Sequence, residues 1–207
     1  MRGRVRDHWN ATYSKLAPVE RSWFQREATQ SLDLIARTGV PLTAPIVDVG
    51  AGASTLVDGL LTRGYSDITL LDVAERALDD TRRRLANPGS TAVHYLVSDV
   101  LEWTPPRRFA LWHDRATFHF LTEAGDRERY REVLASALET DGHAIIATFA
   151  PDGPERCSGL PVRRYSAESL LEEFAGALHL VEQVHETHIT PAGVVQSFVF
   201  VRFARSF

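Results

Sequence analysis

The segment IVDVGAGAST, residues 46–55, carries the strongest structural signal in the chain. Its first half is a short apolar run typical of a buried strand, and Gly50 and Gly52 follow directly. Glycine permits a tight turn there and lets the backbone approach a ligand closely. The apolar pattern of Leu56–Thr62 then predicts a helix, whose first amides would point back toward the turn. The segment therefore predicts a strand, a glycine turn and a helix around a candidate binding site.

Strand and helix patterns alternate along most of the chain. A helix is predicted before the glycine turn, over residues 26–38. After the turn, strands are predicted over 67–72, 92–99, 108–114 and 143–149, with helices over 75–85 (stopped by Asn87-Pro88-Gly89) and 126–138. Apolar strands that alternate with helices favour a parallel sheet with helices on both faces.

The pattern changes near the C-terminus. Ser166 is a candidate N-cap for a helix over residues 166–174. Two strands follow, over 178–186 and 194–203, joined through the turn TPAG. Strands joined without a helix between them are antiparallel. The predicted fold class is therefore α/β, with a seven-stranded, mostly parallel sheet that ends in an antiparallel hairpin.

The 207 residues suit one domain. Within residues 1–207 we expect an N-terminal helical lid over 1–45 and a core over 46–207. Residues 151–161 are expected to form an irregular loop over the far end.

Three acids lie at predicted strand ends beside the glycine turn. Asp72 ends the second strand, about 20 residues beyond the glycines, where a carboxylate can accept both hydroxyls of a ribose. Asp99 ends the third strand beside the expected adenine position, and Asp48 lies two residues before Gly50. Each acid alone fits turn chemistry or helix capping equally well. Together they predict a nucleoside site at the carboxyl edge of the sheet.

The kind of nucleoside is constrained by what the turn lacks. A dinucleotide site normally has a third glycine in G-x-G-x-x-G, and Thr55 stands in that position. S-adenosylmethionine has no pyrophosphate and does not need that glycine. A nicotinamide oxidoreductase and a nucleoside-binding regulator without activity stay open as alternatives.

The motifs VDVGAG, LLD and SDV, in this order, resemble the first three motifs of class I S-adenosylmethionine-dependent methyltransferases. The resemblance covers about residues 46–203 and implies a Rossmann-like core with S-adenosylmethionine as cofactor. It implies that Gly50 and Gly52 pass under the methionine part of the cofactor, with Asp48 near its sulfonium and amine. It also implies that Asp72 binds the ribose hydroxyls, that Asp99 contacts the adenine amine, and that Val73 and Val100 pack on the adenine ring.

The segment LWHDRATFHFL after the fourth strand is similar to the D-R segment of small-molecule thiol methyltransferases, including the thiopurine type. This resemblance implies catalytic roles for Arg115, His119 and Asp114. A thiol reacts as its thiolate, which a cation such as Arg115 or protonated His119 would favour. An ordinary Asp114–Arg115 ion pair and a packed His119 are the structural alternatives.

The N-terminal region carries two further short resemblances. The WFQ segment that begins at Trp23 is similar to a stretch that covers the cofactor in thiol methyltransferases, although Trp23 could equally anchor the lid. The segment HWNATYS, which contains Tyr13, is similar to the start of some protein-lysine methyltransferases. Trp23, Tyr13 and His113 complete the predicted cofactor-binding set.

Charge and composition exclude other classes. The chain has 23 basic and 27 acidic side chains, a formal charge of -4, which argues against a nucleic-acid partner. One cysteine, Cys157, cannot form an internal disulfide or a multi-cysteine zinc site, and no metal is expected. We find no apolar run long enough for a membrane span and no secretory signal. A cytoplasmic monomer or homodimer is expected.

Together these points predict a methyltransferase that uses S-adenosylmethionine and acts on a small-molecule acceptor. The predicted reaction is S-methylation of a thiol, in detoxification or natural-product tailoring. N-methylation of a protein lysine is the alternative.

Overall fold

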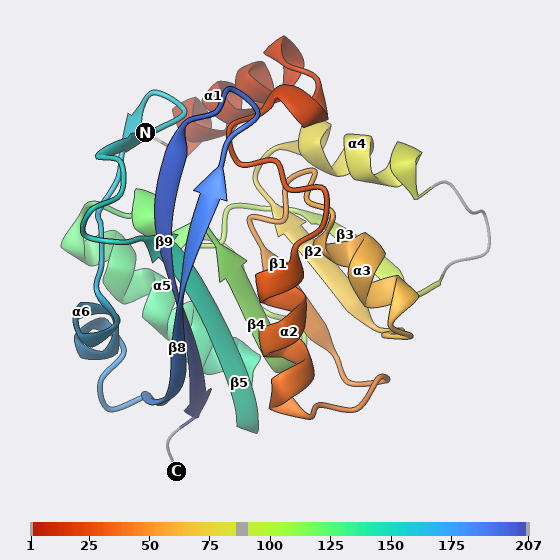
Figure 1. The fold of residues 1–207 in the computed structure, drawn as a ribbon. Coiled ribbons are helices and arrows are strands. Elements are labelled where there is room, and N and C mark those ends of the chain that lie inside the picture. Colours follow the sequence, from red (N-terminus) through yellow and green to blue (C-terminus); the bar gives the residue numbers. More distant parts are fainter. Residues whose placement is uncertain (1, 86–90, 206–207) are drawn as a thin grey trace.

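The computed structural model describes residues 2–85 and 91–205, and its centre is one seven-stranded sheet (Figure 1). The strand order is β3-β2-β1-β4-β5-β9-β8. The strands are β1 (Ile46–Val49), β2 (Ile68–Asp72), β3 (Val93–Val97), β4 (Phe109–Arg115), β5 (Leu138–Phe149), β8 (Leu178–Ile189) and β9 (Val195–Arg205). Strands β1 to β5 pair in parallel, whereas β9 is antiparallel to β5 and β8. The predicted fold class is confirmed.

Helices cover both faces of the sheet. On one face lie α2 (Thr29–Thr38), α3 (Leu56–Thr62) and α4 (Glu75–Arg84), and on the other lie α5 (Ala124–Ala137) and α6 (Ala167–Glu173). Strand β1 shows why the sheet needs both layers. Ile46 packs with α2 and α3, while Val47 and Val49 pack with α5, and all three side chains are fully buried. The alternation of side chains along a strand thus supplies two separate cores.

Element boundaries differ from the prediction where polar residues lie inside an element. Strand β5 begins at Leu138, five residues earlier than predicted, and its polar residues 139–141 are exposed or half-buried. Helix α2 begins at Thr29, three residues later than predicted, because the chain bends at residues 26 and 27 and Ala28 has non-helical backbone angles (φ -83°, ψ 56°). The predicted N-cap Ser166 accepts a hydrogen bond from the Ser169 amide at 3.2 Å. The predicted stop at Asn87-Pro88-Gly89 lies outside the described residues.

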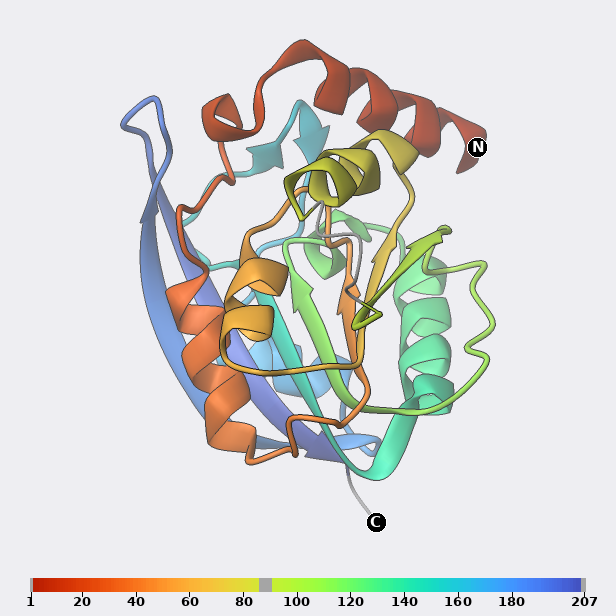
Figure 2. The same ribbon diagram turned by 90° about the vertical axis from the view of Figure 1, so that its right-hand side faces the viewer.

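The N-terminal residues form a cover over the carboxyl end of the sheet (Figure 2). The sequence pattern did not predict helix α1 (Arg2–Lys15), whose outer surface is polar. It packs across α4 and the glycine turn through Trp9 and Tyr13, which lie four residues apart on one face. A 3-10 helix, η1 (Pro18–Glu20), follows. Residues 151–161, expected to be irregular, contain the short hairpin β6 (Arg156–Cys157) and β7 (Leu160–Pro161).

The helices of the described residues are short or polar. None of those within residues 2–85 and 91–205 combines the length and apolarity needed to cross a membrane.

Candidate functional site

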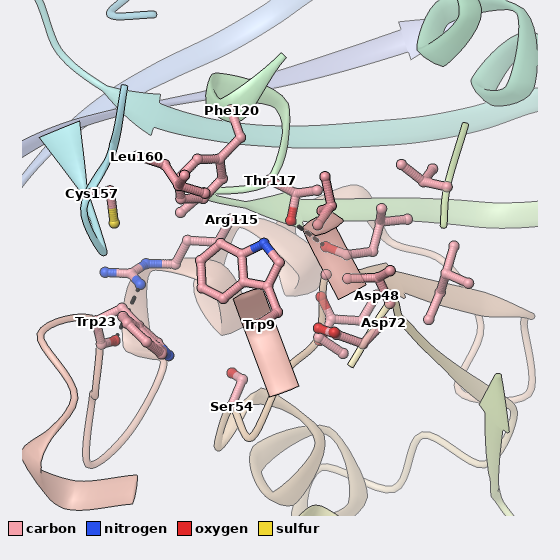
Figure 3. Close-up of a pocket in the computed structure, with 18 of the residues that line it drawn as sticks. Trp9, Trp23, Asp48, Ser54, Asp72, Arg115, Thr117, Phe120, Cys157 and Leu160 are labelled. Atoms are coloured by element: carbon pink, nitrogen blue, oxygen red, sulfur yellow. Dashed lines mark hydrogen bonds between the residues drawn. The ribbon is translucent and has the colours of Figure 1, made fainter. Parts of the chain in front are cut away.

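A cavity of about 500 Å³ lies where the carboxyl ends of β1, β2 and β4 meet the N-terminal cover (Figure 3). This volume is in the range of small-molecule sites. Of the residues predicted to bind the cofactor, all except Gly52 line it, namely Tyr13, Trp23, Asp48, Gly50, Asp72, Val73, Asp99, Val100 and His113. The predicted catalytic residue Arg115 also lines it. The fold thus gathers residues that are far apart in the sequence around one space.

The glycine turn requires its glycines. Gly50 and Gly52 have φ angles of +65° and +55°, in the left-handed region that other residues rarely adopt. A Cβ atom on Gly50 would lie 1.8 Å from the Thr117 hydroxyl oxygen, and that hydroxyl donates to the Val49 carbonyl at 3.2 Å. The backbone of the turn is therefore interlocked with the segment that follows β4.

Asp72 connects the glycine turn to the start of α4. Its Oδ2 accepts a hydrogen bond from the Gly52 amide at 2.8 Å, and its Oδ1 accepts one from the Ala74 amide at 2.7 Å. Burial raises the pKa of Asp72 to about 6, although these two amides favour the ionised form. Each carboxylate oxygen can accept a second hydrogen bond, so the group can still receive hydroxyl donors from the cavity.

The adenine end predicted from the sequence lies beside Asp72. Asp99 accepts a hydrogen bond from the Leu101 amide at 2.9 Å, which fixes the turn after β3. Val73, Val100 and Leu101 present apolar surface to the same part of the cavity. An acidic group next to a narrow apolar wall suits a flat base that carries an amino group.

Arg115 lies at the opposite end of the cavity, and its side chain is 11% exposed. Its Nη1 donates to the Trp23 carbonyl at 3.4 Å, and its guanidinium lies 4.4 Å from the ring centre of Phe198. The Nη2 atom is 3.7 Å from Glu186 Oε2, and neither Nη2 nor Nε has a hydrogen-bond partner within the described residues. Burial lowers the pKa of Arg115 and Glu186 raises it, and a guanidinium stays charged in either case.

Sequence reasoning missed the partners of Arg115. Glu186 lies on β8 and accepts a hydrogen bond from the Gln25 amide group at 3.0 Å. Cys157, on β6, lines the cavity at this end, and burial raises the pKa of its thiol. No local pattern in the sequence distinguishes Glu186 from the other polar residues of an edge strand, because its role depends on the pairing of β8 with β9.

Two predicted catalytic residues do not face the cavity, which corrects the prediction. Asp114 points to the α5 side of the sheet, where it accepts hydrogen bonds from the Tyr130 hydroxyl at 2.6 Å and the Thr117 amide at 2.8 Å. Burial raises its pKa to about 7, although these hydrogen bonds oppose the shift. Successive strand residues point to opposite faces, so Asp114 cannot act beside Arg115 or pair with it.

His119 is fully buried and packs against Phe149 and Phe120, with ring centres 4.8 and 4.5 Å away. Burial, with a smaller effect of nearby Arg115, lowers the pKa of His119 to about 3. The imidazole is therefore neutral near pH 7 and cannot supply the positive charge predicted for it.

Aromatic side chains close the cavity. Trp9 lies 6.0 Å from Trp23, 6.2 Å from Tyr13 and 5.1 Å from Phe120 between ring centres. Figure 3 shows Trp9 between the side of the cavity with Asp48 and Asp72 and the side with Arg115 and Cys157. The cavity therefore has an acidic, nucleoside-sized end at Asp48 and Asp72 and an aromatic end that Arg115 borders.

Within residues 2–85 and 91–205, no group of three or more histidine, cysteine, aspartate or glutamate side chains has an arrangement that could hold a metal ion.

Comparison with known proteins places these features in context. Residues 46–142 match the family model for a methyltransferase domain. The human protein named EEF1A lysine methyltransferase 2 is 24% identical over 194 residues, which cover 87% of this chain and 76% of that protein.

Solved structures resemble the whole chain. A structure from work on conversion of a disulfide bond into a thioacetal group during echinomycin biosynthesis has a TM-score of 0.78 at 17% identity, covering 98% of this chain and 92% of that one. The 1,6-didemethyltoxoflavin-N1-methyltransferase of Burkholderia thailandensis, with bound S-adenosylhomocysteine, has a TM-score of 0.71 at 19% identity, covering 99% and 85%. At these identities the likeness establishes the fold.

Proposed function

Since the chain is an S-adenosylmethionine-dependent methyltransferase with the class I fold, we propose that it methylates the sulfur atom of a small thiol. The observation that carries this proposal is Arg115, a buried cation at the aromatic end of the cavity. Glu186 offsets part of its charge, but the Nε and Nη2 donors of Arg115 have no hydrogen-bond partner within the described residues and favour an anionic acceptor such as a thiolate over an ammonium group.

The acidic end of the cavity fits the cofactor. In this proposal Asp72 accepts hydrogen bonds from the ribose hydroxyls and Asp99 accepts one from the adenine amine. Val73 and Val100 pack on the base. The cofactor supplies an electrophilic methyl group on a sulfonium when it is bound. With the cofactor at the acidic end, the acceptor occupies the aromatic end, which is bounded by Trp23 and the side chains that contact it.

The chain's contribution to the reaction is positioning and electrostatics. The acceptor thiol first releases its proton to solvent, and Arg115 stabilises the resulting thiolate. A sulfur lone pair then forms the new S–C bond in line with the breaking bond, whose electrons stay on the cofactor sulfur. Trp9, Trp23 and Phe120 exclude water from this step and restrict the approach of the acceptor.

The test uses three acceptors that share one aromatic skeleton and differ only in carrying a thiol, a hydroxyl or an amine. We expect the thiol to be methylated at least about 10-fold faster than the other two, with a product identified by mass spectrometry as the thioether. Faster methylation of the amine would overturn the choice of sulfur.

Arg115→Ala provides a second prediction. Loss of the cation should raise the apparent pKa of the bound thiol by about 1 unit and lower kcat/KM about 10-fold at a pH below that pKa. The pH dependence of kcat/KM for the thiol acceptor measures this, and Arg115→Lys, which keeps the charge, should recover part of the loss. An unchanged pH profile in Arg115→Ala would remove Arg115 from the mechanism.

N-methylation of a protein lysine is the second candidate, and two observations favour it. The human relative is named as a lysine methyltransferase. In addition, Trp9 and Tyr13 of the segment HWNATYS both line the cavity. The position of Arg115 favours the thiol because a lysine side chain would have to enter beside a buried cation.

A further inference from the structure

Three buried polar side chains form a continuous hydrogen-bonded chain at the floor of the cavity. His113 Nδ1 lies 2.7 Å from Asp48 Oδ1, and His113 Nε2 lies 2.9 Å from the hydroxyl oxygen of Ser31. The residues are 2%, 3% and 1% exposed, respectively. Asp48 and His113 are register partners on β1 and β4 and line the cavity, whereas Ser31 reaches them from α2.

The chemistry of the groups fixes the direction of the hydrogen bond between His113 and Asp48. An ionised carboxylate can only accept, so His113 Nδ1 carries the proton and donates to Asp48. The Ser31 hydroxyl can either donate to His113 Nε2 or accept from it, so this contact forms in both protonation states of the ring. Ser31 therefore holds the imidazole ring in the orientation that points Nδ1 at Asp48.

This arrangement leaves part of the Asp48 carboxylate for a ligand. Within the described residues, the Asp48 side chain takes part in one hydrogen bond, which it accepts from His113 Nδ1. Its second oxygen, Oδ2, has no such partner and belongs to a side chain that lines the cavity. A buried carboxylate that has one oxygen free of protein donors and facing a cavity attracts a cationic group.

We propose that Ser31 and His113 are positioning residues that hold the Asp48 carboxylate, in one orientation, to receive the α-ammonium group of the cofactor. The proposal rests on the cofactor placement given above and is independent of the acceptor. It assigns His113 an indirect role, where the sequence predicted a direct contact with the cofactor.

The experiment compares two ligands that share the nucleoside and differ in the amino-acid end. S-adenosylhomocysteine carries the α-ammonium, and 5′-methylthioadenosine lacks it. Isothermal titration calorimetry should show that His113→Phe weakens binding of S-adenosylhomocysteine about 10-fold and Ser31→Ala weakens it about 3-fold. Binding of 5′-methylthioadenosine should change less than 2-fold in both variants.

Two further variants separate positioning from a structural effect. His113→Asn keeps a donor near the Nδ1 position and should recover most of the affinity for S-adenosylhomocysteine. Thr148→Val is the matched control because it removes an equally buried hydroxyl that has no hydrogen-bond partner in the described part of the chain and lies outside the cavity lining. It should leave both affinities unchanged.

Several outcomes would overturn the proposal. Equal weakening of both ligands would mean that Ser31 and His113 only stabilise the packing of α2 on the sheet. Equal affinity of the wild-type protein for the two ligands would show that the α-ammonium group contributes no binding free energy at Asp48. If His113→Phe does not fold, as judged by circular dichroism, Ser31→Ala and His113→Asn decide the question. Neither ligand contains an acceptor, so failure of the thiol proposal would leave these results unaffected.

Discussion

Gly50→Ala is expected to eliminate measurable binding of S-adenosylhomocysteine and to lower the free energy of unfolding by about 3 kcal/mol. The added methyl group would collide with Thr117, whose hydroxyl oxygen lies 1.8 Å from the position of the new Cβ. The positive φ angle of Gly50 adds backbone strain. Relief of either problem requires the turn to move away from Asp72 and from the segment after β4. Calorimetric titration and urea unfolding measure the two effects.

Gly39→Ala is the matched control for this prediction. Gly39 also has a positive φ angle, +72°, but a Cβ there would meet nothing within 4 Å. Gly39→Ala should lower the free energy of unfolding by about 1 kcal/mol, the backbone strain alone, and should leave cofactor affinity unchanged. Equal destabilisation in the two variants would mean that contact with Thr117 does not constrain the glycine turn.

Asp72→Ala is expected to weaken binding of S-adenosylhomocysteine by about 2 kcal/mol, or roughly 30-fold. The variant loses the acceptors for the ribose hydroxyls and also the hydrogen bonds that connect the Gly52 and Ala74 amides. Calorimetry at pH 8, where Asp72 is ionised, measures this difference. An unchanged affinity would exclude Asp72 from the nucleoside site.

The same carboxylate makes binding dependent on pH. The pKa of Asp72 is raised to about 6 by burial, so protonation begins to remove hydrogen-bond acceptors as the pH falls toward 6. Affinity of the wild-type protein should therefore be constant well above pH 6 and decrease below it. Asp72→Asn, which does not titrate, should bind weakly and lack this decrease. A parallel decrease in both proteins would assign the pH dependence to another group.

Much of the architecture could be predicted because its signals are local. Gly50 and Gly52 after an apolar strand, and Asp72 at the next strand end, define a βα turn and its neighbour within about 25 residues. The change to an antiparallel hairpin was visible because no helical pattern separates the last two strands. These features depend on short-range pattern and on the general rule that parallel strands share one carboxyl edge.

The rest of the site depends on contacts between distant segments. Helix α1 has a polar outer surface, so only its packing on α4 shows that Trp9 faces the cavity, whereas Tyr13 was expected there from a short resemblance alone. Glu186 meets Arg115 only because β8 pairs with β9. The position of Asp114, by contrast, could have been predicted, because strand alternation alone places it on the face opposite His113 and Arg115. The burial of His119 agrees with the structural alternative of a packed histidine, which the phenylalanines on both sides of it indicated.

The most direct test of a small thiol acceptor follows the methyl group itself. The protein is incubated with S-adenosylmethionine carrying a labelled methyl group, together with a mixture of small thiols and a cell extract, and small molecules are then separated from protein. We predict that the label appears in small molecules as S-methyl thioethers and that Arg115→Ala reduces its amount. Label found in protein as methyllysine, with none in the small-molecule fraction, would contradict the assignment.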